Sequence, residues 1–167
     1  MWDPRFPVVD SRPARLNGYH RALCVLSIQN RGTPERPGLV VGLKRGGSCV
    51  GRALFVEHTH TRETLNYLTQ RELTNHVYAP RLISVRLENN VKVEALAFVA
   101  RPDNPQYAGH LDTEAQARYV LQGHGPYGSS LDYLRNVCRH LDEFGITDGP
   151  LHATLAFAEG GCSHQRA

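Results

Sequence analysis

The order of the predicted elements indicates an α+β fold, because strand-like runs fill the first hundred residues and helical spacing dominates the rest. Continuous apolar composition, as in 39–43, is typical of a strand that is buried on both faces or curved into a barrel. The 167 residues are 41% hydrophobic and 21% charged, so we expect one globular domain over 1–167. The predicted strands are 19–28, 39–44, 49–56, 82–87 and 91–99.

Proline and glycine positions suggest how these strands are connected. Segment 1–18 is rich in proline and has no periodicity, so we predict an irregular arm there. A hairpin is expected over 39–56, turning at 45–48, and a second over 82–99, turning at 88–90.

Helical spacing predicts four helices. The first runs from 61 to 72 with Thr59 or Thr61 as its N-cap, and the second runs to about 121 with Asp112 or Thr113 as its N-cap. Ser129 with Asp132 resembles a capping box for the third, the fourth covers 150–158, and a frayed tail is expected at 160–167.

Glu72 is the residue that this pattern singles out. Leu65, Leu68 and Glu72 are spaced three and four apart, so the helix should bring the carboxylate onto an apolar face. Three interpretations are open: an ion pair with a cation such as Arg71, exposure at a frayed helix end, or a cleft in which burial raises the pKa toward that of a general base.

Composition excludes several classes of protein. The net charge is +3 and the 19 basic residues are scattered among 16 acids, which is too mild a balance to indicate nucleic acid. Neither the four cysteines nor the nine histidines have zinc-ligand spacing, so no metal site is expected. No apolar run reaches membrane-spanning length and the N-terminus lacks a signal-peptide pattern, so we expect a cytoplasmic protein without a membrane partner.

Five short motifs together resemble one family. In order along the chain, they resemble the ChaC-like γ-glutamylcyclotransferases, in particular the bacterial glutathione-specific enzymes, from about residue 2 to residue 155. The resemblance implies a small mixed β-barrel with flanking helices. The motifs are Gly18-Tyr19-His20-Arg21, Arg31-Gly32-Thr33-Pro34-Glu35-Arg36-Pro37-Gly38, Gly46-Gly47-Ser48-Cys49, Arg71-Glu72 followed by Tyr78, and Gly145-Ile146-Thr147-Asp148.

In such enzymes the α-amine of a small-molecule substrate, glutathione or another γ-glutamyl amine, attacks its own γ-glutamyl amide carbon. 5-Oxoproline is released, from glutathione together with cysteinylglycine, and no cofactor is needed. The resemblance makes Glu72 the catalytic residue. It makes Tyr78 a substrate-binding residue, although a strand-edge aromatic is an equal alternative, and Arg31, Gly32 and Thr33 are further candidates for substrate binding.

The chain departs from the family's pattern at its start. The family opens with a strand that ends in a Tyr-Gly-Ser-Leu turn, and this chain begins just after that turn. We therefore expect the first strand to be missing, a sheet edge to be open and the chain as written to be inactive. Two alternatives are a catalytically silent remnant that serves as a binding or interaction module, and a basic surface for an anionic partner such as RNA, formed by Arg31, Arg36, Lys44 and Arg45. The oligomeric state is not predicted.

Overall fold

The computed structural model describes residues 4–162, and its chain divides into two compact units. The first unit contains residues up to 21 together with 43–104, and the second contains 22–42 and everything from 105 onward. The strands are β1 (Asp10–Ser27), β2 (Gly38–Phe55), β3 (Tyr78–Leu87), β4 (Lys92–Ala100), β5 (His124–Gly125) and β6 (Gly128–Ser129), and the helices are η1 (His58–His60), α1 (Thr61–Leu73), α2 (Thr113–Gln122), α3 (Ser130–Glu143) and α4 (Gly149–Cys162).

Four strands form a closed barrel in the order β1-β2-β4-β3, which confirms the predicted mixed barrel and α+β class. Strand β3 pairs antiparallel with both β1 and β4, whereas β2 and β4 pair in parallel at Leu43 and Val99. The open sheet edge expected from the sequence was therefore wrong for the described strands, because β4 takes the place beside β2 and closes the barrel.

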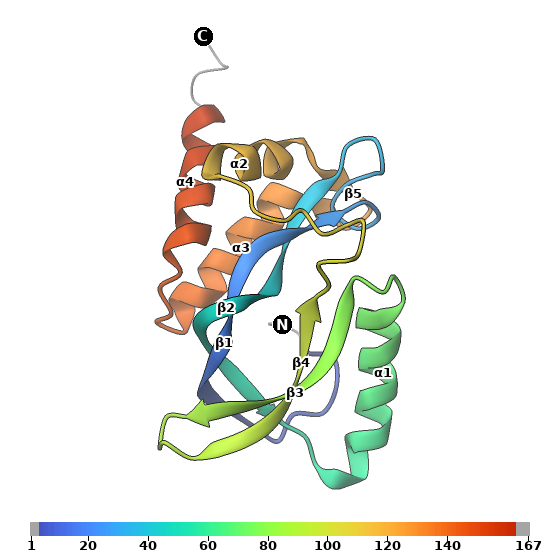
Figure 1. Ribbon diagram of the computed structural model, residues 1–167, viewed down its shortest axis with the longest axis vertical. Helices are drawn as coiled ribbons and strands as arrows, with labels where there is room; N and C mark the ends of the chain where they lie inside the picture. The colour runs from blue at the N-terminus through green and yellow to red at the C-terminus, as the bar shows by residue number, and fades with distance from the viewer. Residues whose placement is uncertain (1–3, 163–167) are drawn as a thin grey trace. The chain divides into compact units, whose positions relative to one another are not determined.

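In the first unit, alternating side chains of the barrel strands form a compact apolar core. Ala14 and Leu16 of β1 pack with Val85 and Leu87 of β3, and all four are buried. Helix α1 contacts β3, and Figure 1 shows α1 running beside the β3–β4 hairpin. The barrel strand that follows α1 thus begins close to the helix end that carries Glu72.

In the second unit, three helices share one core. Helices α2, α3 and α4 pack on one another (Figure 1). Their buried residues include Val120, Leu134 and Leu151, which join Leu23 of β1 and Leu39 of β2. The predicted helix starts are confirmed here: Asp112 accepts a hydrogen bond from the amide of residue 115, and the Ser129 hydroxyl accepts one from that of residue 132.

Several predicted boundaries were wrong. Residues 10–18 of the predicted arm belong to β1, because their side chains alternate inward and outward despite Pro13. The predicted hairpin over 39–56 is one continuous strand, since Gly46 and Gly47 both have positive φ and bend the chain without reversing it. His60, not a threonine, occupies the N-cap of α1 and makes no side-chain cap.

The last helix is longer than predicted. Helix α4 continues through Gly160 to Cys162, into the segment expected to be frayed, and residues 163–167 of that segment lie outside the described residues. None of the helices in 4–162 combines the length and apolar character that crossing a membrane requires.

Candidate active site

Glu72 lies in the last turn of α1, on the side of the helix that is turned toward the protein. Thr64 and Leu68 are buried at four-residue spacing before it, and the Glu72 side chain is 19% exposed. Leu65, predicted to share this face, is 44% exposed, because the buried stripe passes through Thr64, one position earlier. The sequence therefore predicted the inward direction of Glu72, but it named the wrong neighbour.

Two features of its surroundings have opposite effects on the pKa of the Glu72 carboxyl group. Burial raises the pKa of Glu72 above its ordinary value, and the positive charge of Arg71 opposes that rise. The Arg71 Nε lies 3.2 Å from Glu72 Oε1. Glu72 is therefore paired with a cation, as the first interpretation had it, and it is also partly withdrawn from water. Its place in a catalytic cleft stays a prediction.

Arg71 is itself held by an aromatic side chain one helical turn earlier. Its Nη1 donates a hydrogen bond to the Tyr67 hydroxyl at 2.9 Å, and its guanidinium lies 5.9 Å from the centre of the Tyr67 ring. The Phe6 ring packs against Tyr67 with their centres 6.2 Å apart. Tyr67, Arg71 and Glu72 thus form a connected series along one end of α1.

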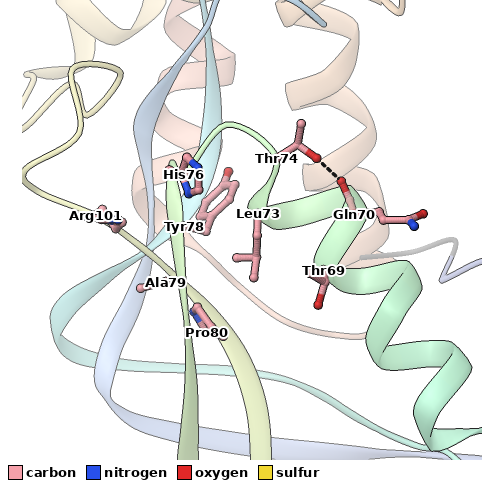
Figure 2. A pocket seen from close by; sticks show the side chains of 9 residues that line it. All are labelled: Thr69, Gln70, Leu73, Thr74, His76, Tyr78, Ala79, Pro80 and Arg101. Carbon is pink, nitrogen blue, oxygen red and sulfur yellow. Dashed lines mark hydrogen bonds between the residues drawn. The ribbon is translucent and has the colours of Figure 1, made fainter.

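Tyr78 lines an open pocket beside the end of α1. Tyr78 is the first residue of β3, it is half-buried, and it pairs in register with Ala100. The pocket has a volume of about 570 Å³, and Glu72 is not among the residues that line it. Figure 2 shows the Tyr78 ring on the strand side of this pocket and Leu73 on the helix side. The lining residues are Thr69, Gln70, Leu73, Thr74, His76, Tyr78, Ala79, Pro80 and Arg101.

Arg31, Gly32 and Thr33 belong to the second unit, and Arg31 and Thr33 have interaction partners there. The Arg31 guanidinium donates to the Tyr127 carbonyl and lies 5.7 Å from the centre of the Tyr133 ring. The Thr33 amide donates to the Arg36 carbonyl at 3.1 Å, and the Thr33 hydroxyl accepts from the Arg36 amide. These contacts fix the shape of the loop, and its role in substrate binding stays a prediction.

Gly32 fills a space in this loop that no larger residue fits. A Cβ atom built on Gly32 would lie 2.2 Å from the Gly38 amide nitrogen and 2.5 Å from the Ser27 carbonyl oxygen. The loop motif noted in the sequence therefore contains a residue that packing requires to be glycine.

Sequence reasoning missed the aromatic partner of Arg71 and the pocket. The four-residue spacing of Tyr67 and Arg71 was a usable signal, because residues four apart are neighbours on a helix surface. No comparable signal exists for the pocket, since Arg101 reaches it through the barrel topology alone. Among the side chains that the structure describes, no group of three or more His, Cys, Asp or Glu residues is placed to hold a metal ion.

Comparison with known proteins shows which family the sequence of this chain matches. The family model described as ChaC-like protein matches residues 1–158. The chain is 29% identical to the glutathione-specific γ-glutamylcyclotransferase of Escherichia coli (strain K12) over 155 residues, which cover 93% of this chain and 67% of that protein. It is 33% identical over 145 residues to glutathione-specific γ-glutamylcyclotransferase 1 of Danio rerio, covering 84% of this chain and 74% of that protein.

A solved structure shows the same fold. The crystal structure of the selenomethionine-labelled γ-glutamyl cyclotransferase specific to glutathione from yeast matches with a TM-score of 0.83 and 20% identity, covering 92% of this chain and 89% of that one. The match to the family model extends over nearly the whole described chain and includes both Glu72 and Tyr78. The chain therefore belongs to the ChaC-like family.

Proposed function

We propose that this protein is a γ-glutamylcyclotransferase that cleaves glutathione to 5-oxoproline and cysteinylglycine, with Glu72 as the general base. The observation that carries the proposal is a carboxylate with a raised pKa, 19% exposed, at the residue to which the motif resemblance assigns the family's catalytic role. Two relatives of this chain are named for glutathione, which supports that substrate over other γ-glutamyl amines.

The reaction needs one group that moves protons. Glu72 takes a proton from the α-ammonium of the substrate, and the freed amine attacks the γ-carbonyl carbon to form a tetrahedral intermediate. The attacking nitrogen, which still carries two hydrogens and a positive charge, loses a second proton as the carbon–nitrogen bond to cysteine breaks. The leaving nitrogen gains this proton and the one that Glu72 holds, so the products are 5-oxoproline and cysteinylglycine with its α-amine in the ammonium form. Since no electrons are exchanged and the proton is returned, the reaction as written needs neither a metal nor a cofactor.

Intramolecular attack makes substrate orientation important. Holding the glutamyl arm bent can lower the barrier by several kcal/mol, on the order of 7–11 in favourable models. The position of Tyr78 supports a role in substrate binding, because its side chain lines the pocket next to the helix that carries Glu72. Arg31, Gly32 and Thr33 stay candidates for substrate contact on the strength of the family resemblance, and a cytoplasmic location stays a prediction.

The test is to measure 5-oxoproline released from glutathione by the wild-type chain and by Glu72→Gln. Glutamine keeps the size of the side chain but cannot accept the proton, so kcat should fall by about 10²- to 10⁴-fold while the thermal unfolding midpoint changes little. Glu63→Gln is the matched control, because Glu63 lies on the same helix with its side chain 83% exposed. A Glu72→Gln variant with wild-type kcat would contradict the proposal.

The same assay separates the proposal from the binding-module alternative. Wild-type chain that binds glutathione without releasing 5-oxoproline would favour the silent module and would agree with the expected inactivity of the chain as written. Measurable release of 5-oxoproline from glutathione would exclude both the silent module and an inactive chain.

A further inference from the structure

Arg71 contacts one oxygen of the Glu72 carboxylate closely: its Nε lies 3.2 Å from Oε1. In the proposed reaction the other oxygen, Oε2, takes the proton from the approaching ammonium. Among the described residues, Arg71 is also the charged group that acts on the pKa of Glu72. A shift of the Arg71 side chain would therefore change both the direction of Oε2 and the charge next to it.

Arg71 is not a freely moving surface cation. The guanidinium is a planar fork, and two of its nitrogens are used on different partners: Nε on Glu72 and Nη1 on the Tyr67 hydroxyl. The guanidinium also lies within cation–π distance of the Tyr67 ring, which packs in turn against Phe6. Three contacts thus fix a side chain that is 39% exposed.

We infer that Tyr67 and Arg71 are positioning residues for the proposed reaction: Tyr67 fixes the Arg71 guanidinium, and Arg71 holds the Glu72 carboxylate in the orientation that accepts the substrate's proton. This inference rests on the proposed function. Neither residue needs to touch the substrate. Arg71 supplies geometry and charge together, whereas Tyr67 supplies geometry alone, and this difference makes the two roles separable by experiment.

The charge of Arg71 sets the pH range in which Glu72 works. Glu72 acts as a base only when ionised, so the rate rises as the pH passes through its pKa. Burial raises that pKa and Arg71 lowers it, so removing the Arg71 charge raises it further. The acid limb of kcat/KM in Arg71→Gln should therefore move to higher pH, with a larger loss of activity at pH 6 than at pH 8.

Two conservative variants isolate the positioning role. Arg71→Lys keeps the positive charge, but one ammonium cannot reproduce the fork that reaches both Tyr67 and Glu72. Tyr67→Phe keeps the ring and removes the hydroxyl. Both should lower kcat by about 10- to 100-fold, as expected for a misplaced catalytic group, while the acid limb and KM stay close to the wild-type values.

Arg62→Gln is the matched control, because Arg62 is an exposed cation on the same helix. It should keep the wild-type kcat and acid limb. An Arg71→Gln variant that behaves like Arg62→Gln would overturn the inference, and so would Arg71→Lys and Tyr67→Phe variants with wild-type kcat. Thermal unfolding of each variant reports whether the fold is intact.

A second readout does not depend on turnover. The pKa of Glu72 is measured by NMR titration of the full chain labelled with ¹³C-glutamate, and its signal is assigned by its loss in Glu72→Gln. An upward shift of this pKa in Arg71→Gln supports the coupling even if no 5-oxoproline is formed, in which case the proposed function fails by itself. An unchanged pKa overturns the inference whether or not the wild-type chain turns over glutathione.

Discussion

At Gly123 the second unit leaves no room for a side chain. A Cβ atom at this position would lie 2.2 Å from the Gly38 Cα and 2.7 Å from the Arg31 carbonyl oxygen. Both are backbone atoms, so neither can move aside by a change of rotamer. The glycines of this region thus allow the loop with the Arg31-Gly32-Thr33 motif to approach the end of α2 closely.

Gly123→Ala should therefore destabilise the protein by about 3 kcal/mol, at the upper end of what overpacking usually costs. The measurement is urea unfolding followed by circular dichroism. Gly160→Ala in the last turn of α4 is the control, because nothing lies within 4 Å of a Cβ there, so the added methyl group should not destabilise the protein. A Gly123→Ala variant as stable as wild type would mean that the loop can shift at little cost.

The sequence predicted Glu72 and offered Arg71 as its ion-pair partner, but it did not predict Tyr67, which contacts Arg71. Spacing alone showed that Glu72 points inward, because helical periodicity depends on the backbone and not on tertiary contacts. The pKa of Glu72 depends on burial in the folded protein, which spacing does not reveal. Thr64 shows the same limit of sequence patterns. A polar residue is usually expected to face solvent, but the Thr64 hydroxyl is buried and has no hydrogen-bond partner among the described residues.

At the scale of elements, a histidine joins α3 to α4. His152 of α4 lies with Nε2 3.0 Å from Asp142 Oδ1 of α3 and with Nδ1 2.7 Å from the Asp148 carbonyl oxygen. The hydrogen bond to the Asp148 backbone and the carboxylate of Asp142 both raise the pKa of His152. The charged form of His152 is therefore favoured in the folded protein.

This shift has a definite sign for stability. The contribution of His152 is fully present below its unfolded pKa, about 6.5, and is lost as pH rises through the higher folded value. The difference in unfolding midpoint between wild type and His152→Gln should thus be larger at pH 5.5 than at pH 8.5. His110→Gln, which changes an exposed histidine, is the control for the loss of an imidazole. Parallel pH curves for wild type and His152→Gln would contradict the assignment.

The prediction of secondary structure failed at the long strand β2. Glycine pairs usually indicate a turn, and the sequence reading placed a hairpin at Gly46 and Gly47. The structure uses their positive φ values to bend β2 while its pairing continues. Only tertiary pairing distinguishes these outcomes, because the local conformation suits both. The second hairpin was predicted well, since its turn includes Asn90 at φ 63 between two alternating strands.

At the scale of the whole molecule, fold class was predictable and the division into units was not. Strand runs before helical runs were enough to indicate α+β, and the family resemblance supplied the barrel. The boundaries of the units fall inside β1 and β2, between residues 21 and 22 and between 42 and 43. Nothing in composition marks a boundary within a continuous strand, because boundaries are normally read from proline- or glycine-rich linkers.

The same continuity leads to a prediction about folding. Because β1 and β2 each supply residues to both units, neither unit can unfold without disturbing strands that the other needs. We therefore expect one cooperative transition, in agreement with the single domain predicted from the sequence. Hydrogen exchange at Val85, buried in the first unit, and at Val120, buried in the second, should report the same opening free energy. Gly123→Ala, placed in the second unit, should lower both values equally. A decrease at Val120 with Val85 unchanged would show that the units unfold independently.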